Sequence, residues 1–301
     1  MLARMNASVE PMPLRAKLAD YFRLMRLDRP VGIYLLLWPT LWALWFAADG
    51  MPSLHVLLVF VAGTVLMRSA GCAINDFADR GFDPHVERTR HRPVASGRVT
   101  PEEAVRLFVA VSLIAFGLLT SLKNTLAIAL AVPAALLAAG YPFAKRHISM
   151  PQAVLGIAFS WGIPMAYAAV QHTVDWRQAG LLMAANACWV IAYDTYYAMV
   201  DRPDDLKIGV KSSAILFGRY DRLAIIGLQA LALLLLALVG IEAGCGLAYD
   251  AGLLVAAALA LWHFRMTRDL SAAACFRAFV QNHWFGVAIL AGLVLDRFLA
   301  A

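Results

Sequence analysis

Long apolar runs, separated by short polar connections, occupy most of the chain. A helix needs about 20 mostly apolar residues to cross a membrane. By that measure the sequence predicts an all-helical membrane protein with nine spans. They are expected at approximately 30–48, 54–74, 103–121, 124–141, 152–170, 177–199, 219–241, 247–265 and 277–299.

The composition agrees with lipid as the solvent. Of the 301 residues, 61% are hydrophobic and 15% are charged, whereas soluble domains have roughly 45–50% apolar and about 25% charged residues. The four cysteines are widely spaced in or beside apolar runs, so they predict neither a disulfide framework nor a zinc site. They are Cys72, Cys188, Cys245 and Cys275.

The net charge of +6 has a clear distribution along the chain. Of the 26 Lys and Arg residues, all except Lys123, Arg177 and Arg297 lie at the N-terminus or at the connections that follow even-numbered spans, when the adjoining span ends are counted with them. Basic residues collect on the cytoplasmic side of membrane proteins. The N-terminus is therefore expected in the cytoplasm and the C-terminus in the periplasm, and the basic charge needs no nucleic acid.

The N-terminal segment, residues 1–29, has no apolar run of the kind found in a signal peptide. Apolar residues recur there at helical spacing, between basic ones, which predicts an amphipathic helix at the membrane interface. These apolar residues are Leu14, Leu18, Tyr21, Phe22 and Met25. We interpret residues 1–301 as a single membrane domain that begins with this cytoplasmic segment.

A first carboxylate-rich cluster continues the second span. Asn75, Asp79 and Asp83 are spaced i, i+4 and i+8, so on one helix they share a face. Carboxylates on one face repel each other unless a cation lies between them. Mg²⁺ prefers such oxygens and keeps positions open for substrate phosphates, and acids at the end of a membrane span are usually functional.

A second cluster, Asp201 to Asp205, follows the sixth span. Asp201 and Asp205 are again i and i+4. Pro203 would break or kink a helix there, so the pair is alternatively expected on a loop, with Asp204 able to replace either ligand. Asp194 lies deeper in the same span, among tyrosines.

Basic residues accompany both clusters, as the binding of a diphosphate requires. They are Arg88, Arg90 and Arg92 after the first cluster, Lys207 and Lys211 after the second, and Lys145 and Arg146 after the fourth span. Two metal ions between facing carboxylate clusters would bridge the diphosphate oxygens.

This chemistry fits the ionisation of an allylic diphosphate. Metal ions and basic side chains stabilise the leaving group, and aromatic faces stabilise the allyl cation. The candidate aromatic residues are Phe77, Tyr141, Tyr193, Tyr196 and Tyr197. Neither a Walker-type loop nor GxGxxG is present, and His85 and His91 lack zinc-ligand spacing.

Several motifs resemble the UbiA family of membrane prenyltransferases. The first signature is Asn75-Asp-Phe-Ala-Asp79-Arg-Gly-Phe-Asp83 with Glu87-Arg-Thr-Arg-His-Arg92-Pro. The second runs from Tyr193-Asp194 through Asp201-Arg-Pro-Asp-Asp205-Leu-Lys207 to Lys211-Ser-Ser. Tyr141-x-x-x-Lys145 resembles a third signature, and Leu37-Trp38-Pro39-Thr40-Leu41-Trp42 is similar to the branch that acts on 4-hydroxybenzoate.

The resemblance implies a nine-helix bundle around a cavity, with a cytoplasmic cap. It implies Mg²⁺ at Asn75, Asp79, Asp83, Asp201 and Asp205, and diphosphate contacts from Arg88, Arg92, Lys145, Lys207 and Lys211. It also implies that Tyr141 lies in the catalytic site, that Asp194 contacts substrate, and that Arg146 is a candidate partner for the acceptor's carboxylate. The sequence departs from the family pattern at Pro203.

The implied reaction transfers a polyprenyl group from its diphosphate to the 3-position of 4-hydroxybenzoate, a step of ubiquinone biosynthesis in the bacterial inner membrane. The active site is expected to face the cytoplasm. Another aromatic or porphyrin acceptor is the alternative within the family. An ion-coupled transporter is the alternative outside it, although transporter acids usually lie near mid-membrane. A soluble all-helical prenyl synthase is excluded by the nine apolar spans.

Overall fold

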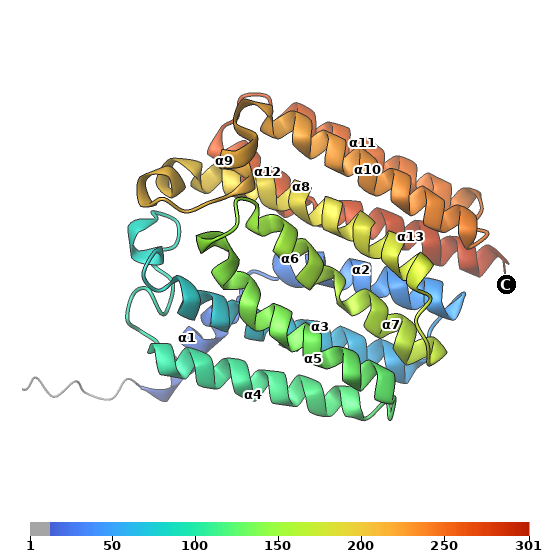
Figure 1. Ribbon diagram of the computed structural model, residues 1–301, viewed down its shortest axis with the longest axis horizontal. Coiled ribbons are helices and arrows are strands. Elements are labelled where there is room, and N and C mark those ends of the chain that lie inside the picture. The colour runs from blue at the N-terminus through green and yellow to red at the C-terminus, as the bar shows by residue number, and fades with distance from the viewer. Residues whose placement is uncertain (1–12, 301) are drawn as a thin grey trace, which may run out of the picture.

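The computed structural model describes residues 13–300, apart from the side chains of Lys145 and Arg146, and these residues form helices without any strand (Figure 1). The long helices lie side by side in one bundle. The α-helices are α1 Leu14–Leu24, α2 Val31–Ala48, α3 Leu54–Asp79, α4 Pro101–Thr120, α5 Thr125–Gly140, α6 Pro151–Ser160, α7 Gly162–Gln171, α8 Trp176–Ile208, α9 Ser213–Phe217, α10 Asp221–Glu242, α11 Leu247–Met266, α12 Ala272–Gln281 and α13 His283–Ala300. Three short 3₁₀ helices are η1 Asp83–His85, η2 Tyr141–Arg146 and η3 Gly218–Tyr220.

Polar residues at the ends of the apolar runs cap several of these helices. The Thr100 hydroxyl accepts the Glu103 amide and the Glu103 carboxylate accepts the Thr100 amide, which makes a capping box at the start of α4. Asn124 accepts the amide of Ala127 at 2.9 Å at the start of α5. Such caps satisfy amides that the first turn of a helix leaves unpaired. The short polar connections therefore fix the helix boundaries that the hydropathy pattern predicts.

The predicted fifth and ninth spans are each divided into two helices. α6 ends at Ser160 and α7 begins at Gly162. Pro164 explains this break, because its ring cannot donate a backbone hydrogen bond and conflicts with the carbonyl four residues earlier. The break between α12 and α13 falls at Asn282, whose side-chain amide donates to the Ala278 carbonyl at 2.8 Å.

Eight helical segments among the described residues are long and apolar enough to cross a membrane. They correspond to all the predicted spans except the sixth, which lies in α8. Asn186 and Asp194 lower the hydropathy of α8, and much of the helix faces protein rather than lipid. The chain is thus an all-helical membrane protein, whereas nine spans and a cytoplasmic cap stay predictions.

α8 forms the centre of the bundle and packs against α6, α10 and α12. Trp189 of α8 is fully buried, with its ring 5.5 Å from that of Trp42 and 5.4 Å from that of Phe285. The Trp42 indole donates to the Gly286 carbonyl at 3.0 Å, so the polar edge of this aromatic core is satisfied. This packing fixes α8 relative to the helices around it.

The two predicted carboxylate clusters emerge at one end of the bundle. Figure 1 shows that α1, the connection over residues 80–100, and α9 lie together at that end. α3 ends there at Asp79, and α8 ends there at Ile208. Residues more than 100 positions apart in the sequence therefore meet in one region.

Candidate functional site

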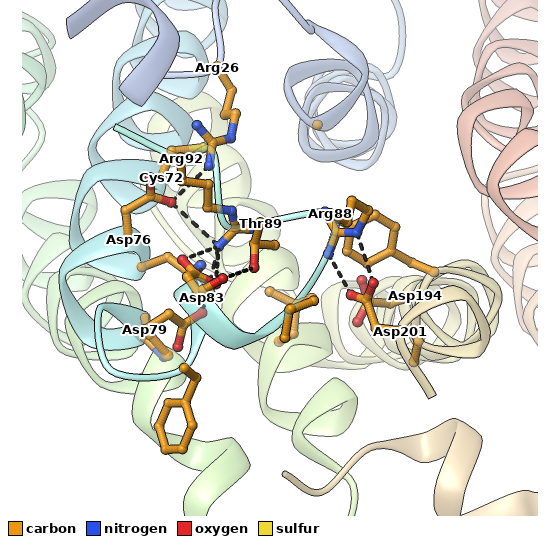
Figure 2. A pocket seen from close by; sticks show the side chains of 18 of the residues that line it. Arg26, Cys72, Asp76, Asp79, Asp83, Arg88, Thr89, Arg92, Asp194 and Asp201 are labelled. Atoms are coloured by element: carbon orange, nitrogen blue, oxygen red, sulfur yellow. Dashed lines mark hydrogen bonds and ion pairs between the residues drawn. The ribbon is translucent and has the colours of Figure 1, made fainter. Parts of the chain in front are cut away.

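A cavity of about 480 Å³ lies where α3 and α8 end. All five predicted metal ligands line it: Asn75, Asp79, Asp83, Asp201 and Asp205. Its walls come from α2, α3, α6, α8, α12 and the 80–100 connection, and Figure 2 shows Asp79 and Asp83 of the first cluster and Asp201 of the second. The structure thus brings the two sequence motifs to one space.

The first cluster does not lie on a single helix as predicted. Asn75 and Asp79 are one turn apart on α3, and the Asn75 amide donates to Asp79 at 3.2 Å. The helix ends at Asp79, and Asp83 begins the 3₁₀ helix η1 instead of continuing one face. Gly81 and Pro84 explain why the helix does not continue to Asp83, because both residues disfavour a helix interior. Asp83 nevertheless turns back toward the same cavity.

Arg92 lies among the carboxylates of the first cluster (Figure 2). Its Nη1 is 3.0 Å from Asp83, 3.5 Å from Asp76 and 3.8 Å from Asp79. Arg26, which follows α1, donates to Asp76 at 2.8 Å. The other Asp76 carboxylate oxygen is buried and has no hydrogen-bond partner among the described residues. Arg92 and Arg26 thus place two positive charges against the buried carboxylates of this cluster.

The second cluster lies on a helix, despite Pro203. α8 continues through Pro203 to Ile208, so Asp201 and Asp205 are one turn apart and the alternative of a loop is wrong. Proline is tolerated because only one helical hydrogen bond is lost, near the end of the helix. Arg88 makes a bidentate contact with Asp201 at 2.9 and 2.5 Å and stacks over the Tyr197 ring at 4.1 Å.

Burial and neighbouring charges shift the ionisation of the groups in the 80–100 connection. Burial raises the pKa of Asp83, and the nearby Arg92 only partly offsets this effect. Burial also favours loss of the proton from Arg92, but Asp76 and Asp83 outweigh it and raise the pKa of that guanidinium. For Arg88, Tyr197 and Asp201 likewise outweigh burial and raise the pKa. Both arginines are therefore fixed positive charges in the cavity.

The remaining predicted site residues are distributed unevenly. Tyr141, Asp194 and Lys211 line the cavity. Lys207 does not line it; its amine is largely exposed and lies 3.0 Å from Asp204. Lys145 and Arg146 belong to η2, and their side chains lie outside the described residues.

Arg68 is a cavity residue that the sequence motifs do not identify. It lies on α3 two helical turns before Asn75, and its guanidinium packs so closely on α2 that a Cβ on Gly32 would be 2.6 Å from it. Arg68 donates to the Cys72 thiol at 2.8 Å, yet no carboxylate among the described residues forms an ion pair with it. An arginine within an apolar run was the available signal, since such residues are costly in a membrane.

A second, apolar cavity of about 220 Å³ adjoins the first. It lies between α2, α3, α4, α5, α6 and α7, and its walls include Phe60, Phe116 and Met165. Arg68, Tyr141 and Phe159 line both cavities, so they mark the boundary between the polar and the apolar space. This arrangement suits a long molecule with an anionic head and an apolar tail.

The donor set of the polar cavity matches a hard divalent cation. Among the described residues no three His, Cys, Asp or Glu side chains form a ready-made metal site. Mg²⁺ does not need one, because it is commonly held by one or two carboxylates together with waters and substrate phosphates. The carboxylates on each side, and the buried Asp76 oxygen that lacks a hydrogen bond, fit such an ion once the arginines release them.

Comparison with known proteins gives a consistent result. Residues 36–286 match the model of the UbiA prenyltransferase family. The 4-hydroxybenzoate octaprenyltransferase of Aromatoleum aromaticum (strain DSM 19018 / LMG 30748 / EbN1) is 54% identical over 288 residues, which cover 96% of this chain and 97% of that protein. The enzyme of the same name from Azoarcus sp. (strain BH72) is 57% identical over 285 residues, or 95% and 99% of the two chains.

Solved structures share the fold. The apo structure of a UbiA homolog from Aeropyrum pernix K1 has a TM-score of 0.77 and 26% identity, and the match covers 88% of this chain and 97% of that one. A UbiA homolog from Archaeoglobus fulgidus, solved with GPP and Mg²⁺, has a TM-score of 0.66 and 17% identity over 90% and 99% of the two chains. At 17% identity the second likeness is one of fold alone.

Proposed function

This chain belongs to the UbiA prenyltransferase family, and on that premise we propose that it transfers a polyprenyl group from polyprenyl diphosphate to ring position 3 of 4-hydroxybenzoate and releases diphosphate. The identity of 54% and 57% to two 4-hydroxybenzoate octaprenyltransferases, over nearly the whole of each chain, supports this acceptor and a role in ubiquinone biosynthesis. The observation that carries the proposal is the joining of a charged cavity to an apolar one at a boundary lined by Arg68 and Tyr141.

The charged cavity holds the diphosphate head. Asn75, Asp79 and Asp83 on one side and Asp201 and Asp205 on the other would hold Mg²⁺, which would neutralise charge on the leaving diphosphate. The Mg²⁺-bound structure of a family member supports a divalent cation.

The arginines and lysines of the site bind the same phosphate oxygens. Arg88 and Arg92 are permanently charged, and Lys211 lines the cavity with its amine 3.1 Å from the His147 carbonyl. When cations take over the carboxylates, both guanidinium groups are free to bind phosphate through their planar forks. Lys145 and Lys207 remain predicted phosphate ligands.

The polyprenyl tail occupies the apolar cavity. Loss of diphosphate develops positive charge at the first carbon of the prenyl chain, near the boundary between the cavities. The faces of Tyr141, Tyr193 and Tyr197 line the charged cavity close to this boundary, where they stabilise an allyl cation. The surrounding helices exclude bulk water, which would otherwise capture the cation.

The acceptor binds between Arg68 and the reacting carbon. Arg68 forms no ion pair with a carboxylate among the described residues, so it is available for the carboxylate of 4-hydroxybenzoate. Arg146, the candidate predicted from the sequence, has its side chain outside the described residues and stays a prediction. The ring carbon beside the hydroxyl attacks the allyl cation and then loses its proton to a base in the cavity. Asp194 lines the cavity seven residues before Asp201 and is the candidate substrate-contacting carboxylate there.

The active site faces the cytoplasm of a bacterium, at the inner membrane. The charge asymmetry supports this orientation, because the basic residues are concentrated at the end of the bundle that holds the site. The N-terminus is then cytoplasmic and the C-terminus periplasmic.

Substitution of the carboxylates tests the proposal. Asp79→Ala and Asp201→Ala, expressed at matched levels in membranes, should each lower transfer by at least about 100-fold, because each removes charge that neutralises the leaving group. Glu102→Ala, an exposed acid of α4, is the matched control and should retain activity. The assay measures product mass with and without Mg²⁺, with prenyl diphosphates of several lengths and with 4-hydroxybenzoate, other phenols or a porphyrin as acceptor. Near-normal turnover in both cluster variants would refute the metal assignment, and preference for another acceptor would refute the substrate.

A further inference from the structure

α1 carries an apolar stripe that the other described residues leave uncovered. Leu14, Leu18 and Phe22 are spaced by one helical turn and are 74%, 55% and 47% exposed. Arg15, Ala19 and Arg23 lie beside the stripe on a second exposed face, which is polar apart from Ala19. α1 therefore presents two different surfaces outward, one suited to an apolar environment and one suited to water.

The third face of α1 is fixed to the protein. Lys17 forms an ion pair with Glu103 at 2.7 Å, and the Tyr21 hydroxyl donates to the same carboxylate at 3.1 Å. Arg98 donates to the buried Asp20 at 3.0 Å. Leu24 is fully buried in an apolar cluster with Ala73 of α3, Val94 and Val99 of the 80–100 connection, and Ala104 of α4.

These contacts lead directly to the first carboxylate cluster. Arg26, two residues after α1, donates to Asp76 at 2.8 Å, and Arg92 approaches the same carboxylate oxygen at 3.5 Å. Arg98 also donates to the His91 carbonyl at 2.8 Å, next to Arg92 in the chain. The position of α1 thus determines the position of the connection that carries Arg88 and Arg92. It also determines how the Asp76 carboxylate is shared between Arg26 and Arg92.

We propose that the stripe of α1 lies in the lipid interface of the bilayer, and that α1 acts as a membrane-seated clamp that positions the 80–100 connection over the cavity. Lipid is the occupant because α1 is followed after six residues by α2, a candidate membrane span, so the stripe cannot lie far from the bilayer surface. Arg15 and Arg23 lie beside the stripe, where anionic headgroups attract them. The functional meaning of the clamp rests on the function proposed above.

The position of the apolar stripe in the lipid interface is tested with a fluorophore on each exposed face of α1. Leu18→Cys and Ala19→Cys are labelled with nitrobenzoxadiazole in nanodiscs of phosphatidylglycerol and phosphatidylethanolamine, with labelled wild type as the background. Emission at position 18 should shift to the blue and be quenched by doxyl lipids, whereas position 19 should remain aqueous. Equal aqueous emission at both positions, or shielding of position 18 by a second copy of the chain in cross-linking, would overturn the proposal.

The clamp is tested by hydrogen exchange, which requires no turnover. Replacing all three stripe residues by Ser (L14S, L18S and F22S) should speed exchange over residues 83–99 by about fivefold or more, because the clamp loses its support. Arg26→Gln should speed the same segment while the fluorophore at position 18 keeps its lipid signal. Leu216→Ser, an exposed apolar residue of α9, and the segment over residues 267–271 are the controls.

Unchanged exchange over residues 83–99 in both variants would overturn the clamp, even if α1 lies in lipid. The two proposals fail separately. Wild type that does not prenylate 4-hydroxybenzoate refutes the function but leaves the exchange and fluorescence results standing. A clamp that fails these measurements leaves the transfer reaction standing.

Discussion

Single charged residues decide what the cavity binds, and Arg92 shows this best. Its guanidinium contacts three carboxylates of the first cluster, so a divalent ion has to displace it in order to bind there. Phosphate oxygens offer the displaced guanidinium a new partner. Binding of metal and of diphosphate should therefore reinforce each other through this one side chain.

Arg92→Gln separates these effects. Without the competing guanidinium, Mn²⁺ alone should bind about tenfold more tightly, because a buried carboxylate cluster that loses its positive partner attracts another. Added pyrophosphate should then raise Mn²⁺ affinity less than it does in wild type. The measurement is electron paramagnetic resonance of free Mn²⁺ in nanodiscs. Arg90→Gln, on the same connection but paired with the exposed Glu87, is the control. Weaker Mn²⁺ binding in Arg92→Gln would contradict the displacement.

Arg68 allows an equally direct test of acceptor binding. A charge-assisted hydrogen bond contributes about 1.5–3 kcal/mol, so Arg68→Met should raise the KM for 4-hydroxybenzoate by about 10- to 100-fold. The KM for polyprenyl diphosphate should change little. Exposed Arg106, on α4, supplies the control Arg106→Met. With 4-hydroxybenzamide, which lacks the carboxylate, wild type and Arg68→Met should perform alike; a persistent difference would show that Arg68 acts otherwise.

At the residue scale the sequence predicted which carboxylates converge but not what neutralises them. The spacing of Asn75 and Asp79 was sufficient to place them on one face, because a helix turn is a local property. The partners Arg92 and Arg26 depend on long-range folding of the 80–100 connection and α1. Arg68 was counted among the cytoplasmic charges, and only the packing against Gly32 shows that it lies inside the bundle.

At the scale of helices, local rules succeeded where polar caps end an apolar run, but the i+4 pattern at Asp83 and the proline at position 203 were misleading. α3 stops at Asp79 although Asp83 continues the i+4 pattern. α8 continues through Pro203 although proline disfavours a helix interior. In α8 the burial of Tyr196, Ala198 and Met199 against the rest of the bundle outweighs the local cost of the proline. Such tertiary contacts cannot be predicted from a local sequence motif.

Pro203→Ala tests that balance. Alanine restores a hydrogen-bond donor to the Met199 carbonyl and costs about 3 kcal/mol less than proline in a helix interior, so the thermal unfolding midpoint should rise by a few degrees. Mn²⁺ affinity in the presence of pyrophosphate should stay within about twofold of wild type. Pro101→Ala is the control, because an amide at the first position of α4 would have no hydrogen-bond partner within the helix, so the proline there costs no hydrogen bond. Intrinsic fluorescence during heating reports the midpoint. A lower midpoint would mean that the site depends on the proline backbone.

At the scale of the whole molecule, the apolar runs predicted the long helices, because lipid requires each span to be apolar over its own length. α8 contains the predicted sixth span, but it is not among the eight described segments that are apolar enough to cross a membrane. It lies in the centre of the bundle, so it can carry Asn186 and Asp194 without exposing them to lipid, and its hydropathy falls accordingly. The arrangement of the spans around α8 depends on packing contacts that hydropathy does not encode.

The proposed orientation of the bundle rests on the distribution of charge alone, and it gives the last prediction. With Lys123 outside and the carboxylate clusters inside, Lys123→Cys should react with a membrane-impermeant maleimide in intact spheroplasts, and Arg90→Cys should react only after permeabilisation. Both positions are exposed, whereas the native Cys72 and Cys275 are buried, and labelled wild type corrects for Cys188 and Cys245. Basic residues resist translocation, so the reverse pattern would place the site in the periplasm. In that orientation a cytoplasmic acceptor could not reach Arg68, and the proposed reaction would need another supply of substrate.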